Sequence, residues 1–173
     1  MQKLIATSLF VLCWLVFIGQ VEKDTGYIVR IGDKAPPVSL SLTSGETIHL
    51  DDLKGKVVVL QFTASWCSVC RKEMPHLENE VWLPNKDKEF LLIGVDYDEP
   101  LEKVIAFGQQ MNITYPMALD PGAEIFAKFA QKRSGVTRNV VIDKNGYIAF
   151  LTRLFDRNEF NAMKEEIVAL LDE

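Results

Sequence analysis

The sequence predicts an α/β domain in which helices flank a central mixed β-sheet. Two short runs of β-branched and aromatic residues, at 57–62 and 90–95, are typical of strands buried on both faces. Segments with apolar residues at helical spacing follow both runs. Two hairpin signals, centred on Ser44-Gly45 and on Asn145-Gly146, add antiparallel pairs. Strand–helix units and hairpins in one chain indicate parallel and antiparallel pairing in the same sheet.

Composition narrows the class of protein before any motif is considered. The chain has 173 residues, of which 48% are hydrophobic and 25% charged, which suits one globular domain with an apolar core. Its formal net charge of -5 provides no basic field to attract a phosphate backbone. Nucleic acid is therefore excluded as an expected partner.

Residues 1–21 are expected to be a signal peptide or a membrane anchor. No charged residue occurs between Lys3 and Glu22, and roughly 17 to 20 apolar residues are enough to span a bilayer. Residues 17–20 include only one small residue, Gly19, which fits a cleavage site poorly and favours an uncleaved anchor. Lys3 before the segment and acidic residues after it place the domain on the extracytoplasmic side, in the periplasm or cell envelope. A buried first helix of the domain is the less favoured alternative.

The remaining chain divides into a tether at residues 22–34 and a domain at residues 35–173. The domain begins with a hairpin of strands at 38–42 and 47–50, and a polar connection then leads to the buried strand at 57–62. A helix is expected to start at Cys67, because apolar residues recur three or four positions apart from Cys70 to Val81. Pro75 should kink this helix, since it cannot donate to the carbonyl of Arg71.

The second half of the domain alternates between strands and helices. After the strand at 90–95, Asp98 and Glu99 provide an acidic cap and Pro100 the first turn of a helix at 101–111. Asp120-Pro121 repeats that start signal and predicts a second helix to about residue 132. A hairpin at 140–151 and a helix at 159–171 complete the order.

Cys67 and Cys70 are the only cysteines outside the apolar segment that holds Cys13. In an oxidising compartment such a pair is either a static disulfide or a redox-active site. A static bond is the weaker interpretation, because a disulfide that closes so short a loop removes little entropy from the unfolded chain. At a helix start, Cys67 is favoured as a thiolate, and Cys70 lies one turn later, within disulfide reach. Trp66 adds a flat apolar surface beside the sulfur, although packing alone would also explain it.

Residues 62–75 resemble the active-site segment of extracytoplasmic thioredoxin-like thiol-disulfide oxidoreductases of the TlpA/ResA type. The similarity extends from about Gly32 through most of the chain. It implies a thioredoxin-like fold with an added N-terminal β-hairpin, in which Cys67 is the attacking thiol and Cys70 the resolving one. Glu73 matches the acidic residue implicated in proton transfer, although an exposed helix glutamate would fit its spacing equally well.

The same resemblance implies how the protein would work. Its substrates would be cysteine-containing client proteins, and a membrane protein that carries electrons across the bilayer would recharge it. It implies a reductant that needs no cofactor, although residues alone do not determine the direction of transfer, since the potential depends on how far each thiolate is stabilised.

Thr137 departs from the family pattern, which places a cis-proline before the strand facing the cysteines. A non-proline cis bond costs about 3 to 4 kcal/mol, so a trans peptide is expected. Thr137 and Arg138 resemble the matching segment of peroxiredoxins, a redoxin or AhpC/TSA-like feature, which makes Arg138 an expected neighbour of Cys67. Trp66, Thr137 and Arg138 are therefore the expected substrate-binding residues. A peroxiredoxin-like thiol peroxidase is an alternative, although the peroxiredoxin threonine or serine is replaced by Ala64.

A copper- or haem-handling binding protein is the alternative from another class. Cys67, Cys70, Met74 and His76 could hold copper(I), which prefers soft sulfur ligands. The chain has a single CxxC, however, and His76 lies off the cysteine face of the helix. A lone CxxC beside a strand–helix unit favours redox chemistry, so no metal site is expected.

Overall fold

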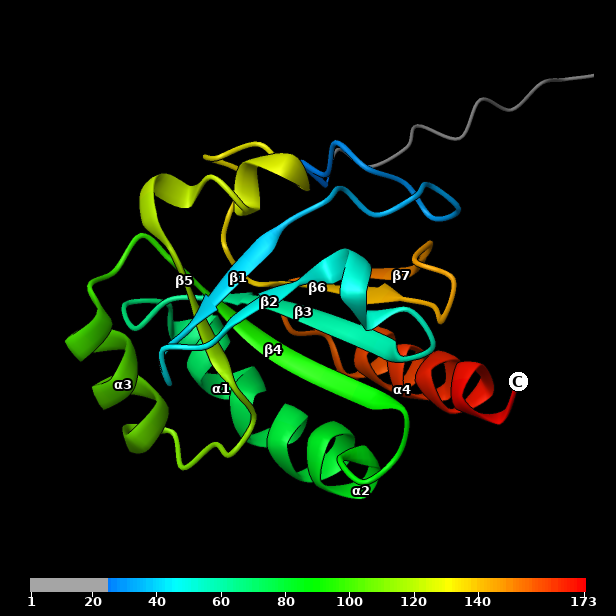
Figure 1. Ribbon diagram of the computed structural model, residues 1–173. Helices are drawn as coiled ribbons and strands as arrows, with labels where there is room; N and C mark the ends of the chain where they lie inside the picture. Colours follow the sequence, from blue (N-terminus) through cyan, green and yellow to red (C-terminus); the bar gives the residue numbers. More distant parts are fainter. Residues whose placement is uncertain (1–24) are drawn as a thin grey trace, which may run out of the picture.

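A mixed sheet forms the centre of the structure, a computed structural model that describes residues 25–173. Within these residues the sheet has seven strands in the order β2-β1-β5-β4-β3-β6-β7 (Figure 1). Their bounds are β1 Ser39–Leu42, β2 Thr47–His49, β3 Val57–Thr63, β4 Phe90–Tyr97, β5 Met117–Asp120, β6 Arg138–Ile142 and β7 Ile148–Arg153. The neighbours β3/β4 and β4/β5 are parallel, and the other pairs are antiparallel. The signal or anchor expected at residues 1–21 lies outside the described residues.

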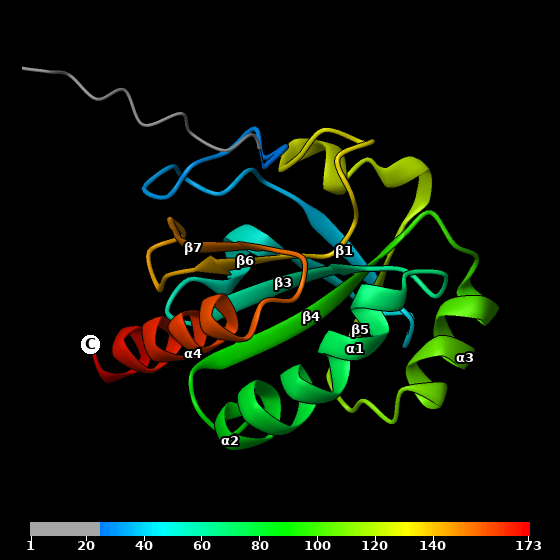
Figure 2. The ribbon, with the colours of Figure 1, turned by 180° about the vertical axis from the view of Figure 1, so that it is seen from behind.

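Helices cover one face of this sheet (Figure 2). They are α1 Ser68–His76, α2 Leu83–Asn85, α3 Leu101–Gln110 and α4 Arg157–Asp172. Their apolar side chains, such as Met74, Phe107 and Met163, form one core cluster with Val57 and Leu92 of the sheet. No helix within residues 25–173 has the length and apolarity needed to cross a bilayer.

The second face of the sheet is covered by loops and short 3₁₀ turns instead. Phe126 and Phe129 pack there against Phe62 of β3. Their ring centroids lie 5.3 and 5.5 Å, respectively, from the ring centroid of Phe62. Both faces of β3 are thus covered, and all seven of its residues are buried. This confirms the expected doubly buried strand, and the strand delivers the chain directly to the cysteines.

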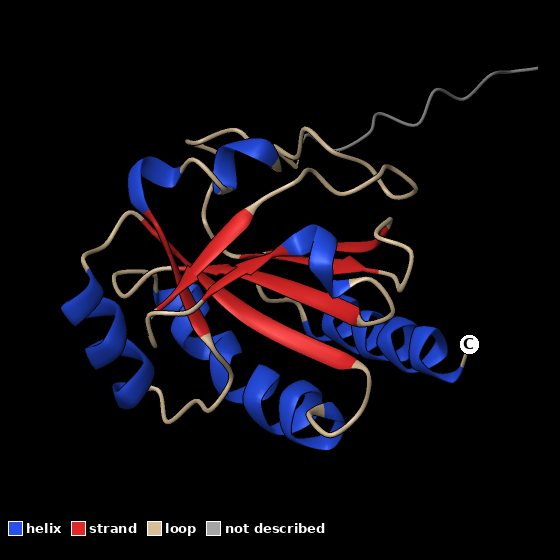
Figure 3. Ribbon diagram, in the orientation of Figure 1, coloured by secondary structure: helices blue, strands red, loops and turns tan. Residues whose placement is uncertain are grey.

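Most expected elements are present, but one expected helix is absent and one strand was not predicted (Figure 3). The helix expected after Asp120-Pro121 is replaced by two 3₁₀ turns, Pro121–Ala123 and Phe126–Lys128. The Asp120 carboxylate accepts the N–H groups of Ile125 and Phe126 at 2.7 and 2.8 Å, and Gly122 adopts a φ of 67°, which interrupts a helix. Strand β5 was not predicted, because its four residues carry no alternating pattern and only pairing with β4 and β1 makes them a strand.

The expected cap of α3 also needs correction. The acidic residues before α3 do not cap it: Pro100 occupies the cap position, while Asp98 accepts the N–H of Gly122 at 2.7 Å. Pro75, where a kink is expected, lies one residue before the end of α1, and a π-helical turn, Leu77–Trp82, follows and continues into α2.

The described part of the expected tether is packed against the domain. Residues 25–34 are referred to here as the N-terminal strap. Ile28 N donates to Phe129 O, and Gly32 N donates to Ile148 O, each at 2.8 Å. The hydroxyl of Tyr27 donates to the carbonyl oxygens of Thr152 at 2.7 Å and Asn139 at 3.2 Å. The strap is therefore held against the domain by backbone and side-chain hydrogen bonds.

The Tyr27 hydroxyl should contribute measurably to stability. We expect Tyr27→Phe to lower the free energy of unfolding by about 1 to 2 kcal/mol, because two carbonyl oxygens lose a shared donor. Chemical denaturation measures the change, with Tyr147→Phe as the matched control because Tyr147 is 47% exposed. An equal loss of unfolding free energy in Tyr27→Phe and Tyr147→Phe would mean that the hydrogen bonds of the Tyr27 hydroxyl make no specific contribution to stability.

Candidate active site

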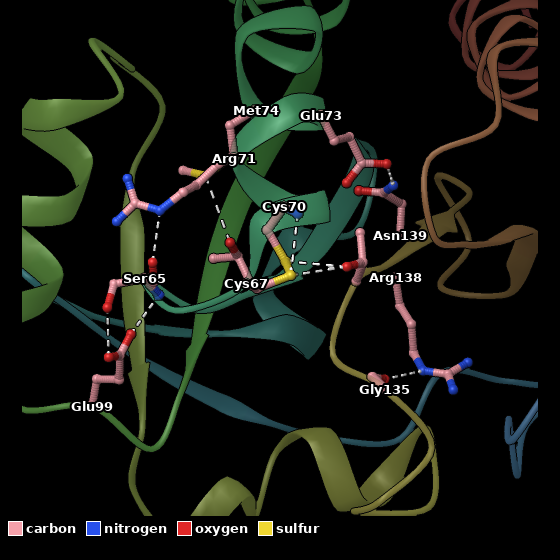
Figure 4. The surroundings of a disulfide bond; sticks show 12 residues. Ser65, Cys67, Cys70, Arg71, Glu73, Met74, Glu99, Gly135, Arg138 and Asn139 are labelled. Atoms are coloured by element: carbon pink, nitrogen blue, oxygen red, sulfur yellow. Dashed lines mark hydrogen bonds between the residues drawn. A yellow bond between two sulfur atoms is a disulfide. The ribbon is translucent and has the colours of Figure 1, made fainter.

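The chain leaves β3 at Thr63 and enters α1 at Ser68, and the two cysteines straddle the start of this helix. Cys67 occupies the N-cap position, and a disulfide joins it to Cys70 with a Cα–Cα distance of 5.3 Å (Figure 4). Cys70 is completely buried, whereas Cys67 retains 8% exposure. Of the two residues, Cys67 is therefore the one with surface that another molecule can reach.

The helix start supplies the charge stabilisation that a reactive thiol needs. The backbone N–H of Cys70 donates to the Cys67 sulfur at 3.1 Å. This N–H is one of the first-turn groups that lack a backbone partner, and their partial positive charge favours an anion. A thiolate at Cys67 is thereby favoured over a thiol.

Thr137 lies directly against the disulfide. Its hydroxyl oxygen is 3.1 Å from the Cys67 sulfur and 3.2 Å from the Cys70 sulfur, and its side chain is buried. The residue immediately precedes β6, whose pairing with β3 places Arg138 opposite Phe62. Residues 25–173 contain no cis peptide bond, so the expected trans peptide before Thr137 is confirmed.

Glu73 is buried, which rules out an exposed helix glutamate. Its Oε1 accepts the side-chain N–H of Asn139 at 2.8 Å, and Asn139 lies opposite Gln61 in the β3/β6 pair. Burial raises the pKa of Glu73 to about 7, although hydrogen bonds from Asn139 and Gln61 oppose the shift. Sequence reasoning missed Asn139 and Gln61; a polar residue inside each apolar strand run was the only signal.

Arg138 does not lie beside Cys67, contrary to expectation. Its side chain points away from the disulfide (Figure 4), and its Nε donates to Gly135 O at 3.1 Å. The guanidinium carbon lies 4.4 Å from the centre of the Tyr27 ring. Side chains alternate along a strand, so Arg138 and Asn139 must point to opposite faces, and only Asn139 faces α1. The thiol peroxidase alternative loses its main geometric support.

The loop before the cysteines is fixed by side chains that the sequence analysis did not assign to this role. Glu99 accepts the N–H of Ser65 at 2.6 Å and its hydroxyl at 2.7 Å, and Arg71 Nε donates to Ser65 O at 2.7 Å. Glu99 was expected to cap α3 and instead supports this loop. Trp66, next in the chain, is 62% exposed and has its ring edge-on to Tyr97, so it offers an apolar surface beside Cys67.

A second buried carboxyl group lies near this loop. Asp96, at the end of β4 and opposite Thr63, is fully buried. Burial, reinforced by the negative charge of Glu99, raises the pKa of Asp96 to about 8. Asp96 therefore stays largely protonated at neutral pH.

The side chains proposed for copper are not brought together. His76 bonds to Glu80 at 2.9 Å and stacks on Phe155, and Met74 accepts the hydroxyl of Thr63 at 3.6 Å. Within residues 25–173, no group of three or more His, Cys, Asp or Glu side chains is placed to hold a metal ion.

The raised pKa of Glu73 predicts a pH-dependent effect on stability. The unfolded chain releases this proton near pH 4.5, whereas the folded chain keeps it until about pH 7. Stability is therefore lost as the pH rises between these values and stays lost above them. We expect Glu73→Gln to be more stable than the wild type at pH 8, by roughly 2 to 3 kcal/mol, and to lose this advantage at pH 4.

Denaturation at both pH values measures the effect, with Glu102→Gln as the control because Glu102 is exposed. An identical difference between wild type and Glu73→Gln at pH 4 and pH 8 would contradict the assigned pKa.

Comparison with known proteins agrees with this geometry. A family model described as Redoxin matches residues 30–169. The thiol-disulfide oxidoreductase ResA of Bacillus cereus is 35% identical over 120 residues, which cover 69% of this chain and 68% of that protein. ResA of Geobacillus kaustophilus is 28% identical over 151 residues, 85% of each protein.

Solved structures support the same assignment. The solution structure of a candidate protein disulfide isomerase from Bacteroides thetaiotaomicron superposes with a TM-score of 0.83 at 56% identity, covering 86% of this chain and 94% of that one. The crystal structure of a candidate thiol:disulfide interchange protein DsbE from Chlorobium tepidum gives 0.71 at 29% identity, with coverage of 83% and 99%. The chain therefore belongs to the redoxin family, among the thioredoxin-like thiol-disulfide oxidoreductases of the TlpA/ResA type.

Proposed function

We propose that this oxidoreductase reduces disulfides of client proteins outside the cytoplasm, with Cys67 as the attacking thiol and Cys70 as the resolving thiol. The observation that carries the assignment is the difference between the two sulfurs. Cys67 keeps 8% exposure at a helix N-terminus, while Cys70 is completely buried and linked to it. A client can reach only the first sulfur, and the second is in place to displace that client.

The first step is attack by the Cys67 thiolate on one sulfur of a client disulfide. The client S–S bond breaks, a mixed disulfide forms, and the other client sulfur leaves as a thiolate that takes a proton from solvent. The N–H of Cys70 and the hydroxyl of Thr137 are the groups that stabilise the attacking thiolate. Trp66 provides an apolar surface on which the client segment can pack.

The second step releases the client. Cys70 loses its proton and attacks the Cys67 sulfur, the mixed disulfide breaks, and the second client sulfur leaves as a thiolate. Glu73 is the proposed acceptor of the Cys70 proton, because it lies one turn further along α1 and its pKa of about 7 allows both protonation states near neutrality. The client gains two electrons, and the Cys67–Cys70 disulfide is formed.

A complete cycle requires a dithiol that reduces this disulfide again. We infer that a membrane protein supplies these electrons, and that residues 1–21 export the domain and keep it at the membrane surface. The apolar character of that segment and the acidic residues after it support this location. Thiol-disulfide exchange needs no group beyond the two thiols on each side.

The assignment of roles predicts an asymmetry between the two cysteines. Reduced Cys70→Ser should accumulate a mixed disulfide with a disulfide-containing test substrate such as insulin, because no second thiol can displace the substrate from Cys67. Cys67→Ser should form no adduct and show no reductase activity. Non-reducing gel electrophoresis and mass spectrometry detect the adduct, and Cys13→Ser is the control that should behave as the wild type. Equal trapping by both single variants would overturn the assigned order of attack.

The direction of transfer is tested by the reduction potential of the pair. We expect a value near that of thioredoxin, about -270 mV, when the protein is equilibrated with defined thiol buffers. A value near that of DsbA, about -120 mV, would make the protein an oxidant and contradict the proposed direction.

A further inference from the structure

Arg138 has a structural environment that the proposed chemistry does not explain. It is fully buried in β6, and its side chain faces away from α1. Burying a guanidinium is costly unless its N–H groups find acceptors, so its partners indicate what it does. Its hydrogen-bond acceptors within residues 25–173 lie in two segments far apart in the sequence, the N-terminal strap and the loop before β6.

The first set of contacts joins Arg138 to the strap. Its Nη2 donates to Thr25 O at 2.7 Å, and its guanidinium lies over the ring of Tyr27 at 4.4 Å. A cation above an aromatic face is attracted by the ring, most strongly where water is excluded. Gly26, between Thr25 and Tyr27, has a φ of 72°, and a side chain there would overlap Ser134. The strap backbone therefore packs directly against the loop at this position.

The second set of contacts joins Arg138 to the loop at residues 131–137. Nη2 also donates to Ser134 O at 3.0 Å and to Ser134 Oγ at 2.7 Å, and Nε donates to Gly135 O (Figure 4). Gln131 N at the start of this loop donates to Gly26 O of the strap at 2.9 Å. The loop ends at Thr137, whose hydroxyl contacts both sulfurs.

We infer that Arg138 is a positioning residue that joins the N-terminal strap to the loop at residues 131–137 and thereby holds Thr137 against the Cys67–Cys70 pair. This inference rests on the proposed function, in which the Thr137 hydroxyl donates to the Cys67 thiolate. Arg138 acts on the sulfur only through Thr137, because its own charge lies on the other face of β6. The strap is therefore a determinant of thiol reactivity as well as the link to residues 1–24.

The inference is tested by a double-mutant cycle on the full chain. All proteins carry Cys13→Ser, are fully reduced, and are alkylated with iodoacetamide over a range of pH; mass spectrometry follows the adduct on Cys67. We expect Thr137→Val to raise the pKa of the Cys67 thiol by about one unit, a roughly tenfold smaller thiolate fraction at neutral pH, because a hydrogen bond to the charged form is lost. Arg138→Lys should shift this pKa in the same direction, because lysine cannot reach all three acceptor residues.

The decisive comparison is the effect of Arg138→Lys in the Thr137→Val background, where we expect no further pKa shift. A purely structural role would lower the melting temperature in both backgrounds and leave the thiol pKa unchanged, and that result would overturn the inference. A shift of equal size in both backgrounds would also overturn it, since Arg138 would then act without Thr137. Tyr27→Leu replaces Arg138→Lys if the latter does not fold, and Ile31→Ser, at an exposed strap position, is the control.

The cycle also separates this inference from the proposed function. If Cys67 of the wild type shows an ordinary thiol pKa and the Thr137→Val variant matches it, the assigned activation of Cys67 is wrong. If the wild type and Thr137→Val differ as expected and Arg138→Lys has no effect on the thiol, only the role of Arg138 is wrong.

Discussion

The antiparallel pairing of β3 with β6 is the contact on which the candidate active site depends. β3 carries the chain to Cys67, and β6 starts immediately after Thr137, so their register decides what faces the sulfurs. Phe62 lies opposite Arg138, and Gln61 lies opposite Asn139. A shift of one residue would exchange the faces of Arg138 and Asn139, because side chains alternate along a strand. The contact of Thr137 with the sulfurs, the hydrogen bond from Asn139 to Glu73 and the contacts of Arg138 with the strap would all be lost together.

Burial provides the chemistry of this site and reduces stability at the same time. Glu73 and Asp96 are held inside the core, and burial raises the pKa of both groups into the neutral range. A carboxyl group with such a pKa can exchange protons at physiological pH, but its ionisation is disfavoured by the fold. Cores usually avoid such groups. One of them lies in α1, the helix that carries Cys70, and the other lies opposite Thr63 at the end of β3, so their positions are typical of a functional site rather than of packing.

The reactive loop is supported from two sides by long-range contacts. On one side, Glu99 and Arg71 bind the backbone of Ser65. On the other side, Arg138 connects the strap to the loop that ends at Thr137. Apart from Arg71, these supports come from segments that lie far from the cysteines in the sequence, so the position of the sulfurs depends on long-range contacts. Exchange chemistry benefits from this arrangement, because an attacking sulfur must be aligned with the bond that it breaks.

The sequence by itself determined the elements whose signals are local. The apolar run of β3, the helical spacing after Cys67 and the hairpin signals at both ends are visible within a few residues, and so is the cysteine pair. The resemblance carried by residues 62–75 added the fold family and the expected roles of Cys67, Cys70 and Glu73. Thr137 was placed opposite the cysteines by the same reasoning, and the structure brings it there.

Only the tertiary structure decided the features that depend on contacts between distant segments. β5 is a strand because β4 and β1 flank it, and the segment after Asp120 is not a helix because the Asp120 carboxylate binds the backbone N–H groups of that segment. The direction of Arg138, the burial of Glu73 and the packing of the strap likewise follow from register and long-range hydrogen bonds. A local pattern indicates which face of an element a residue occupies. The side chains and backbone groups that the residue contacts on that face are determined by the register and packing of the assembled sheet.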